Sequence, residues 1–64
     1  MYSKEIQTIL SEGSKSYAAK EYDAASEKYA EACELYNTEN DADDADLLLL
    51  YGKALYQAAV SKSE

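Results

Sequence analysis

The most informative segment of the chain is residues 13–32, which read GSKSYAAKEYDAASEKYAEA. Small and aromatic residues recur in it at intervals of three and four, the spacing that places side chains on one face of a helix. This set is Gly13, Tyr17, Tyr22, Ala25, Tyr29 and Ala32. A short polar break at Lys20 and Glu21 divides the segment, so it predicts two helices that are joined tightly enough to lie antiparallel.

The pattern continues on both sides of this segment. We expect the first helix over residues 3–19, with Ser3 as its N-cap, and the second helix over residues 22–36. Small side chains at Gly13 and Ala25 would allow the two helices to cross closely, because little bulk separates their backbones. Residues 3–36 are therefore predicted to form one helix pair.

A third helix is expected over residues 41–61. An acidic connector, residues 37–46, overlaps its start, and Asn40 is the predicted cap. The run 47–51, LLLLY, is apolar on every side of such a helix. A helix of this kind is expected to have neighbours on both sides.

The third helix repeats part of the first. Gly52 precedes Tyr56 by the same spacing that separates Gly13 from Tyr17. This order of small and aromatic residues is similar to that of tetratricopeptide repeats (TPRs), helix pairs that stack into a right-handed solenoid. We predict an all-α fold of three helices: one TPR-type antiparallel hairpin and the first helix of a second repeat, in a single domain over residues 1–64. The alternative is that an Ala- and Tyr-rich helix pair matches the pattern by chance.

Composition restricts the function. Six lysines are scattered among thirteen acidic residues, for a net charge of −7, so direct nucleic-acid binding is not expected. The charge favours a basic partner, or it serves solubility alone. Leu47–Leu50 is too short to cross a membrane. With no His and with Cys33 as the single cysteine, we expect no catalytic residue, metal or cofactor, and no enzyme activity.

Two groups of carboxylates are interpreted as solvated surface. Glu27, Glu31 and Glu34 share one side of the second helix, as exposed charges commonly do. The aspartates of the connector do not make an EF-hand, because Asp46 stands where that loop needs its glycine.

A candidate protein-binding surface follows from the TPR pattern, in which the first helices of successive repeats line a concave groove. Its members would be Leu10, Ser14, Tyr17, Leu49, Lys53 and Tyr56. This mixture of apolar, aromatic and cationic side chains suits an amphipathic peptide, although Tyr17 and Tyr56 are equally well explained as core residues. A co-chaperone carboxylate clamp is not expected, because Leu10 and Ser14 occupy places where it needs Lys and Asn.

Four stretches together resemble the start of the NASP family of histone chaperones. They are residues 12–15 (EGSK), 20–25 (KEYDAA), 27–32 (EKYAEA) and 50–55 (LYGKAL). The resemblance implies a nuclear protein of several repeats that escorts core histones of the H3 and H4 type for chromatin assembly. This chain would be its first repeat plus one helix, and the family's long acidic tract would lie beyond Glu64.

A second interpretation remains open. The chain could be a general protein-interaction or self-association TPR scaffold unrelated to chromatin. It is suggested by the third helix, whose face bearing Leu50 and Val60 is expected to lack a covering helix.

Overall fold

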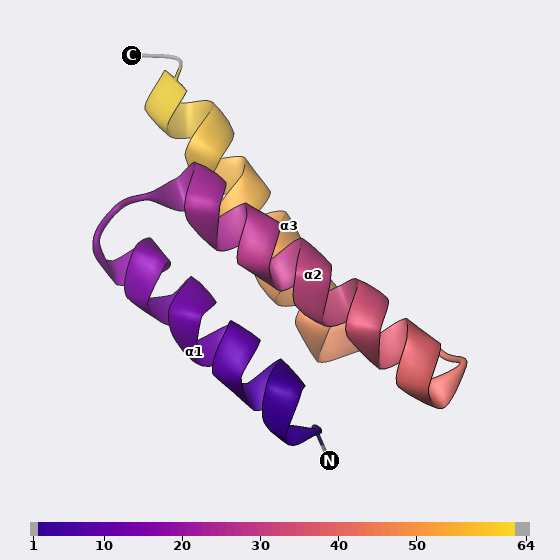
Figure 1. Cartoon of the computed structure of the whole chain (residues 1–64). Helices are drawn as coiled ribbons and strands as arrows, with labels where there is room; N and C mark the ends of the chain where they lie inside the picture. Colours follow the sequence, from indigo (N-terminus) through magenta and orange to yellow (C-terminus); the bar gives the residue numbers. More distant parts are fainter. Residues whose placement is uncertain (1, 63–64) are drawn as a thin grey trace.

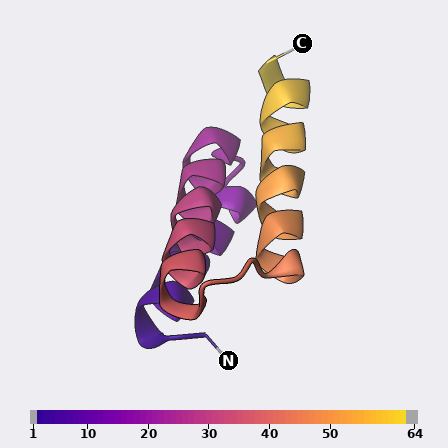
Figure 2. The same ribbon diagram turned by 90° about the vertical axis from the view of Figure 1, so that its right-hand side faces the viewer.

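Three helices account for the described part of the chain. The computed structural model describes residues 2–62 and contains α1 (Lys4–Ala18), α2 (Tyr22–Asn40) and α3 (Ala45–Lys62). The chain runs along α1, returns along α2 and turns again into α3, so that successive helices are antiparallel (Figure 1). α2 packs against both other helices, and α3 stands beside the pair that α1 and α2 form (Figure 2). The predicted all-α fold is confirmed.

The ends of α1 follow the predicted local signals. Ser3 is the N-cap, and its hydroxyl accepts a hydrogen bond from the backbone N of Ile6 at 3.3 Å. At the other end Lys20 adopts a left-handed φ of 65°, and the backbone N of Glu21 donates to the carbonyl of Ser16 at 2.8 Å. This is the usual way in which the last carbonyls of a helix are satisfied. The tight turn explains why the second helix begins at Tyr22 as expected.

α2 extends further than predicted. It continues through Asn40 rather than ending near residue 36, so residues 37–40 of the expected connector 37–46 belong to the helix. Thr38 Oγ1 donates to the carbonyl of Glu34, and the helix ends where Asp41 adopts a φ of 52°. Polar side chains carry no apolar periodicity, which is why the sequence pattern did not reveal this last turn.

The start of α3 also differs from the prediction. The helix begins at Ala45 rather than at residue 41, and Asn40 is not its cap. Asp44 has that role, because its Oδ1 accepts a hydrogen bond from the backbone N of Leu47 at 3.1 Å. The same oxygen accepts a bond from Tyr2 Oη at 3.2 Å. Burial, together with this bond, raises the pKa of Tyr2.

Replacing Asp44 with Ala is expected to lower the free energy of unfolding by about 1 kcal/mol, because the first turn of α3 loses its cap. Asp44→Asn is the matched control, since its amide oxygen can still accept from Leu47. Urea unfolding followed by circular dichroism measures both. Equal losses in the two variants would contradict the capping role.

The core lies along α2 and consists of two small clusters. One contains Ile6, Ile9, Ala32 and Leu47, and the other contains Ala25, Tyr29 and Ala54. The partly buried Leu10 and Leu50 pack against both clusters. Because many of the α2 and α3 core positions are Ala, the helices approach closely but bury little apolar area. Such a core gives a chain of this length limited stability.

Gly13 permits a close approach between α1 and α2. A Cβ atom at this position would lie 2.8 Å from Tyr29 Cε1 and 3.3 Å from Lys28 Cβ. The predicted close crossing at Gly13 is confirmed, and Ala25 is fully buried beside it. Gly52 is different: within residues 2–62, a Cβ there would meet nothing within 4 Å. The two glycines therefore match in sequence but not in surroundings.

No helix within residues 2–62 is both long enough and apolar enough to cross a membrane.

Candidate protein-binding site

The structure brings together two members of the predicted groove, one from α1 and one from α3. The Nζ of Lys53 lies 5.9 Å from the centroid of the Tyr17 ring, at the outer limit of a cation–π interaction. With Tyr29 and Leu50 they line a depression of about 60 Å³. The groove between α1 and α3 is therefore only a narrow notch at this point.

The other predicted α1 residues have mixed roles. Leu10 is partly buried against both core clusters, and is therefore mainly a packing residue. Tyr17 is also partly buried, and its ring meets that of Tyr22 edge-on at 5.2 Å. Ser14 is exposed, with its Oγ 3.5 Å from the hydroxyl of Tyr29. Of the three residues predicted on this helix, Ser14 is exposed and Tyr17 is partly exposed, so these two are available to a partner.

The predicted residues on α3 are open to solvent. Leu49 is 70% exposed and Tyr56 is 67% exposed, so neither is a core residue. The face of the third helix that bears Leu50 and Val60 was expected to be uncovered. Val60 is exposed, but Leu50 packs against the core, so the expectation is wrong for Leu50. The exposed large apolar side chains of α3 are Leu48, Leu49, Leu55, Tyr56 and Val60.

A second surface, missed in the sequence, lies between α1 and α2. We call it the acidic groove; it has a volume of about 300 Å³ and is lined by Glu5, Ile9, Glu31, Glu34, Leu35 and Thr38. The two ion pairs between described residues, Lys28 with Glu12 and Lys62 with Asp23, leave its three glutamates unpaired. The groove thus combines two apolar side chains, Ile9 and Leu35, with negative charge that no described ion pair compensates.

The spacing of residues in the sequence indicates the part of the acidic groove that α2 contributes. Glu31 and Glu34 lie one turn apart on α2 and adjoin Leu35, which indicates a face of mixed character. By charge pattern alone, these carboxylates are predicted to be a solvated surface. The contribution of Glu5 and Ile9 depends on how α1 packs against α2, and no local pattern contains that information.

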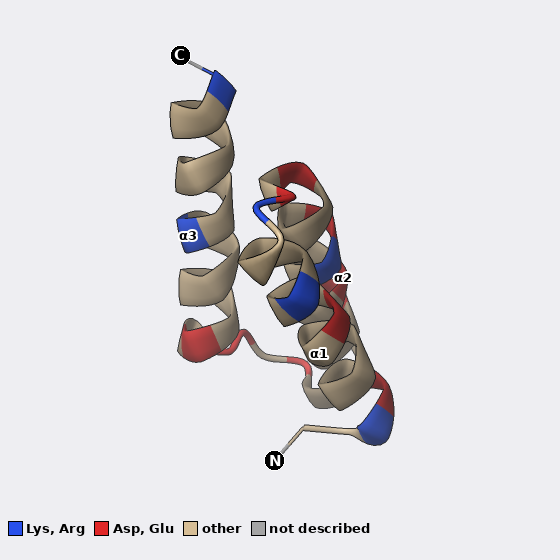
Figure 3. Cartoon of the chain, turned by 90° about the vertical axis from the view of Figure 1, so that its left-hand side faces the viewer, with Lys and Arg blue, Asp and Glu red and all other residues tan. Residues whose placement is uncertain are grey.

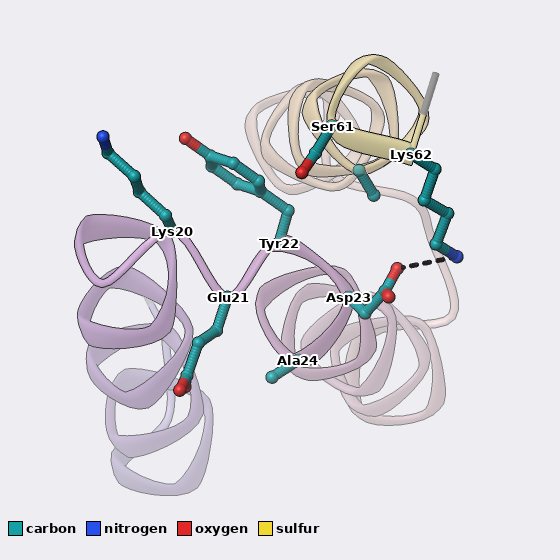
Figure 4. A pocket seen from close by; sticks show the side chains of 8 residues that line it. Lys20, Glu21, Tyr22, Asp23, Ala24, Ser61 and Lys62 are labelled. Carbon is teal, nitrogen blue, oxygen red and sulfur yellow. Dashed lines mark ion pairs between the residues drawn. The ribbon is translucent and has the colours of Figure 1, made fainter. Parts of the chain in front are cut away.

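A third hollow lies where the α1–α2 turn approaches the end of α3. It has a volume of about 320 Å³, and Figure 4 shows the ion pair that crosses its edge, between Lys62 and Asp23 at 3.2 Å. Both partners are mostly exposed, so the pair contributes little to stability. Lys20 and Glu21 also line the hollow, so positive and negative charges balance and favour no ligand of one sign.

Cys33 is the single thiol and lies partly buried on α2. Burial raises the pKa of this thiol, and the nearby Asp43 and Asp44 raise it further. It is therefore protonated at neutral pH, whereas nucleophilic or metal-binding cysteines act as thiolates. In the described part of the chain, no cluster of Cys, Asp and Glu is arranged to hold a metal ion.

The fold and these surfaces define a small, acidic, all-α protein that presents shallow grooves and one apolar helix face. No known protein family profile and no solved structure matches the chain. It is similar, however, to the NASP-related protein sim3 of Schizosaccharomyces pombe, with 32% identity over 65 residues. The match covers 97% of this chain but only 16% of that protein. This similarity supports the relation to the NASP family that the sequence motifs indicated.

Proposed function

We propose that this chain is a protein-binding TPR module of a NASP-type histone chaperone. The similarity to a NASP-related protein along 97% of the chain carries the proposal. The antiparallel hairpin, with the Tyr29 ring seated over Gly13, supports the TPR assignment. Under this proposal the module binds core histones, those of the H3 and H4 type by family resemblance. The protein would act in the nucleus and would not be an enzyme.

The acidic groove is the surface that best suits a histone. Histones are basic, and a net charge of −7 attracts basic proteins over a long range. The side chains of Ile9 and Leu35 could receive the apolar side of an amphipathic segment, while Glu5, Glu31 and Glu34 face its cations. The notch at Tyr17 suits such a partner less well, because Lys53 stands over it.

Titration with H3–H4 complexes tests the proposal. A fluorescently labelled chain at physiological salt is expected to show saturable binding by anisotropy. Lysozyme, a basic protein without the histone fold, is the control for attraction by charge alone and is expected to bind without saturation. If histones do not bind, or bind no better than lysozyme, the proposal is overturned for this chain.

Variants that replace carboxylates with neutral amides identify the surface that binds histones. Replacing both Glu31 and Glu34 with Gln is expected to weaken histone binding about tenfold, because two interfacial charges are lost. Glu21→Gln combined with Asp41→Asn removes the same charge from exposed positions beyond the two ends of the groove, neither of which lines it. This control is expected to change affinity less than about twofold. Equal weakening of histone binding by the two double variants would contradict the assignment of the acidic groove as the binding surface.

A second candidate function is a protein-interaction scaffold unrelated to chromatin. The exposed apolar side chains of α3, including Leu49 and Tyr56, favour it. The same titration distinguishes the two candidates, since a general scaffold has no reason to prefer histones over lysozyme.

A further inference from the structure

The notch between α1 and α3 contains a lysine that no described carboxylate neutralises. We call it the tyrosine notch; its lining residues are Tyr17, Tyr29, Leu50 and Lys53. The two ion pairs between described residues use Lys28 and Lys62 instead. The Nζ of Lys53 lies 5.9 Å from the centroid of the Tyr17 ring, which is a weak contact at the outer limit of a cation–π interaction. The ammonium group is therefore free to bind an anion more strongly than it binds the ring.

The segments on the two sides of the tyrosine notch lack carboxylates, although the chain as a whole is acidic. Residues 13–20 and 47–61 contain three lysines, Lys15, Lys20 and Lys53, and no Asp or Glu. α3 accordingly carries acidic residues only at its start (Figure 3). Because charges more than about 8 Å away are largely screened at physiological salt, local composition matters more here than the net charge of the chain. The charge around the notch thus favours an anion.

A buried hydroxyl group also lines the tyrosine notch. Tyr29 is only 4% exposed, and its Oη lies 3.5 Å from Ser14 Oγ, which is long for a hydrogen bond between hydroxyls. Either oxygen can be the donor, so the pair retains one O–H group that this bond does not use. A carboxylate would accept a shorter and stronger bond from that group.

The size of the tyrosine notch restricts what can enter it. Its volume of about 60 Å³ equals that of roughly two water molecules, which suits one carboxylate group but not a ring. The Tyr17 ring is held edge-on against Tyr22 at 5.2 Å, and the Tyr29 ring is seated over Gly13, so these walls have little freedom to move apart. A carboxylate on a slender CH2 stem fits such a space. The carboxylate at the end of a main chain carries a side chain and an amide on the adjoining carbon and fits less well.

We propose that the tyrosine notch binds the carboxylate of an Asp or Glu side chain that a partner protein presents. The ammonium of Lys53 binds one carboxylate oxygen, and the hydroxyl pair of Ser14 and Tyr29 donates to the carboxylate from the other side of the notch. Both are charge-assisted hydrogen bonds, which are stronger than bonds between neutral groups. This inference does not depend on the proposed function, because the acidic groove lies elsewhere and takes the opposite charge.

An NMR titration of the nitrogen-15-labelled chain tests the chemistry of the ligand. The probe is the tripeptide Ala-Glu-Ala with both ends blocked, added at constant ionic strength. We expect saturable shifts of the Ser14, Tyr17 and Lys53 amide signals with a dissociation constant of about 10–100 mM, the range that one charge-assisted hydrogen bond supports. Blocked Ala-Gln-Ala has nearly the same shape without the charge and is expected to give no saturable shift. If the two peptides behave alike, the proposal is overturned.

A third peptide distinguishes a side-chain carboxylate from a chain terminus. Ala-Gln-Ala with a blocked amino end and a free carboxyl end carries the same charge on its main chain. We expect it to bind at least about fivefold more weakly than blocked Ala-Glu-Ala, because the narrow notch hinders the branched carbon beside its carboxylate. Equal or tighter binding of this peptide would show that the notch does not select a side chain.

Two lysine variants test the location of the site. Lys53→Met removes the charge but keeps an unbranched stem, and it is expected to weaken binding of blocked Ala-Glu-Ala at least about tenfold. Lys15→Met makes the same change at an exposed position of α1 that does not line the notch. This control is expected to change the dissociation constant less than about twofold. Circular dichroism establishes that both variants remain helical. Equal effects of the two variants would mean attraction by charge alone and overturn the proposed site.

Discussion

Replacing Leu47 with Ala is expected to lower the free energy of unfolding by about 3 kcal/mol, the typical cost of removing a fully buried leucine. Leu47 is 1% exposed and packs in one cluster with Ile6, Ile9 and Ala32. It is the α3 residue through which that cluster joins all three helices. A chain of this length has a total stability of roughly 3–10 kcal/mol, so the variant is expected to lose between about a third and all of it.

The matched control is the same replacement two residues further along the helix. Leu49 is 70% exposed, so Leu49→Ala is expected to change the free energy of unfolding by less than about 0.5 kcal/mol. Urea unfolding followed by circular dichroism measures both variants. Similar losses at Leu47 and Leu49 would contradict the orientation of α3.

The two helix-interior glycines are expected to respond in opposite directions to the same change. Gly13→Ala is expected to lower the free energy of unfolding by about 1–2 kcal/mol, because overpacking outweighs the gain in helix propensity. The new Cβ would stand 2.8 Å from Tyr29, which is only 4% exposed and has little room to move. Gly52→Ala is expected to raise the free energy of unfolding by about 0.5–1 kcal/mol, because alanine has the higher helix propensity and its Cβ would contact no neighbour.

Thermal unfolding of both glycine variants at low concentration provides the measurement. Stabilisation by Ala at Gly13 as well as at Gly52 would show that α1 and α2 cross less closely than the structure indicates. A loss at Gly52 would instead mean that something already covers this position in the monomer.

The hairpin was predictable because its signals are local. Ser3 is followed by apolar residues at helical spacing, and a polar break comes just before Tyr22. Each of these signals acts within one or two turns of helix. The close crossing at Gly13 was also predictable. The second helix must run back along the first, and a residue without a side chain at position 13 lets the two backbones approach.

The connector was harder to predict for a physical reason. Several of its residues can either extend a helix or cap the next one, and the choice is made by backbone conformation. Asp41 in the left-handed region ends α2, and Asp44 begins α3 because its Oδ1 reaches the backbone N of Leu47. Composition alone favoured Asn40 as the cap, which the structure shows to be incorrect.

The candidate binding surfaces were only partly accessible from sequence. Positions such as Lys53 and Tyr17 were correctly placed near one another by the repeat pattern. The acidic groove was not found, because Glu5 and Glu31 belong to different helices and meet only after those helices pack.

By itself, the sequence determined that this chain is all-α, that its first two helices form an antiparallel hairpin, and that Gly13 lies at their crossing. Spacing and turn residues contain this information because helix formation is a local process. Only the tertiary structure decided that Leu47 is buried while Leu49 is exposed, and that Gly13 is covered while Gly52 is open. Burial depends on neighbours supplied by distant parts of the chain, so residues of identical type in similar local sequence acquire different roles.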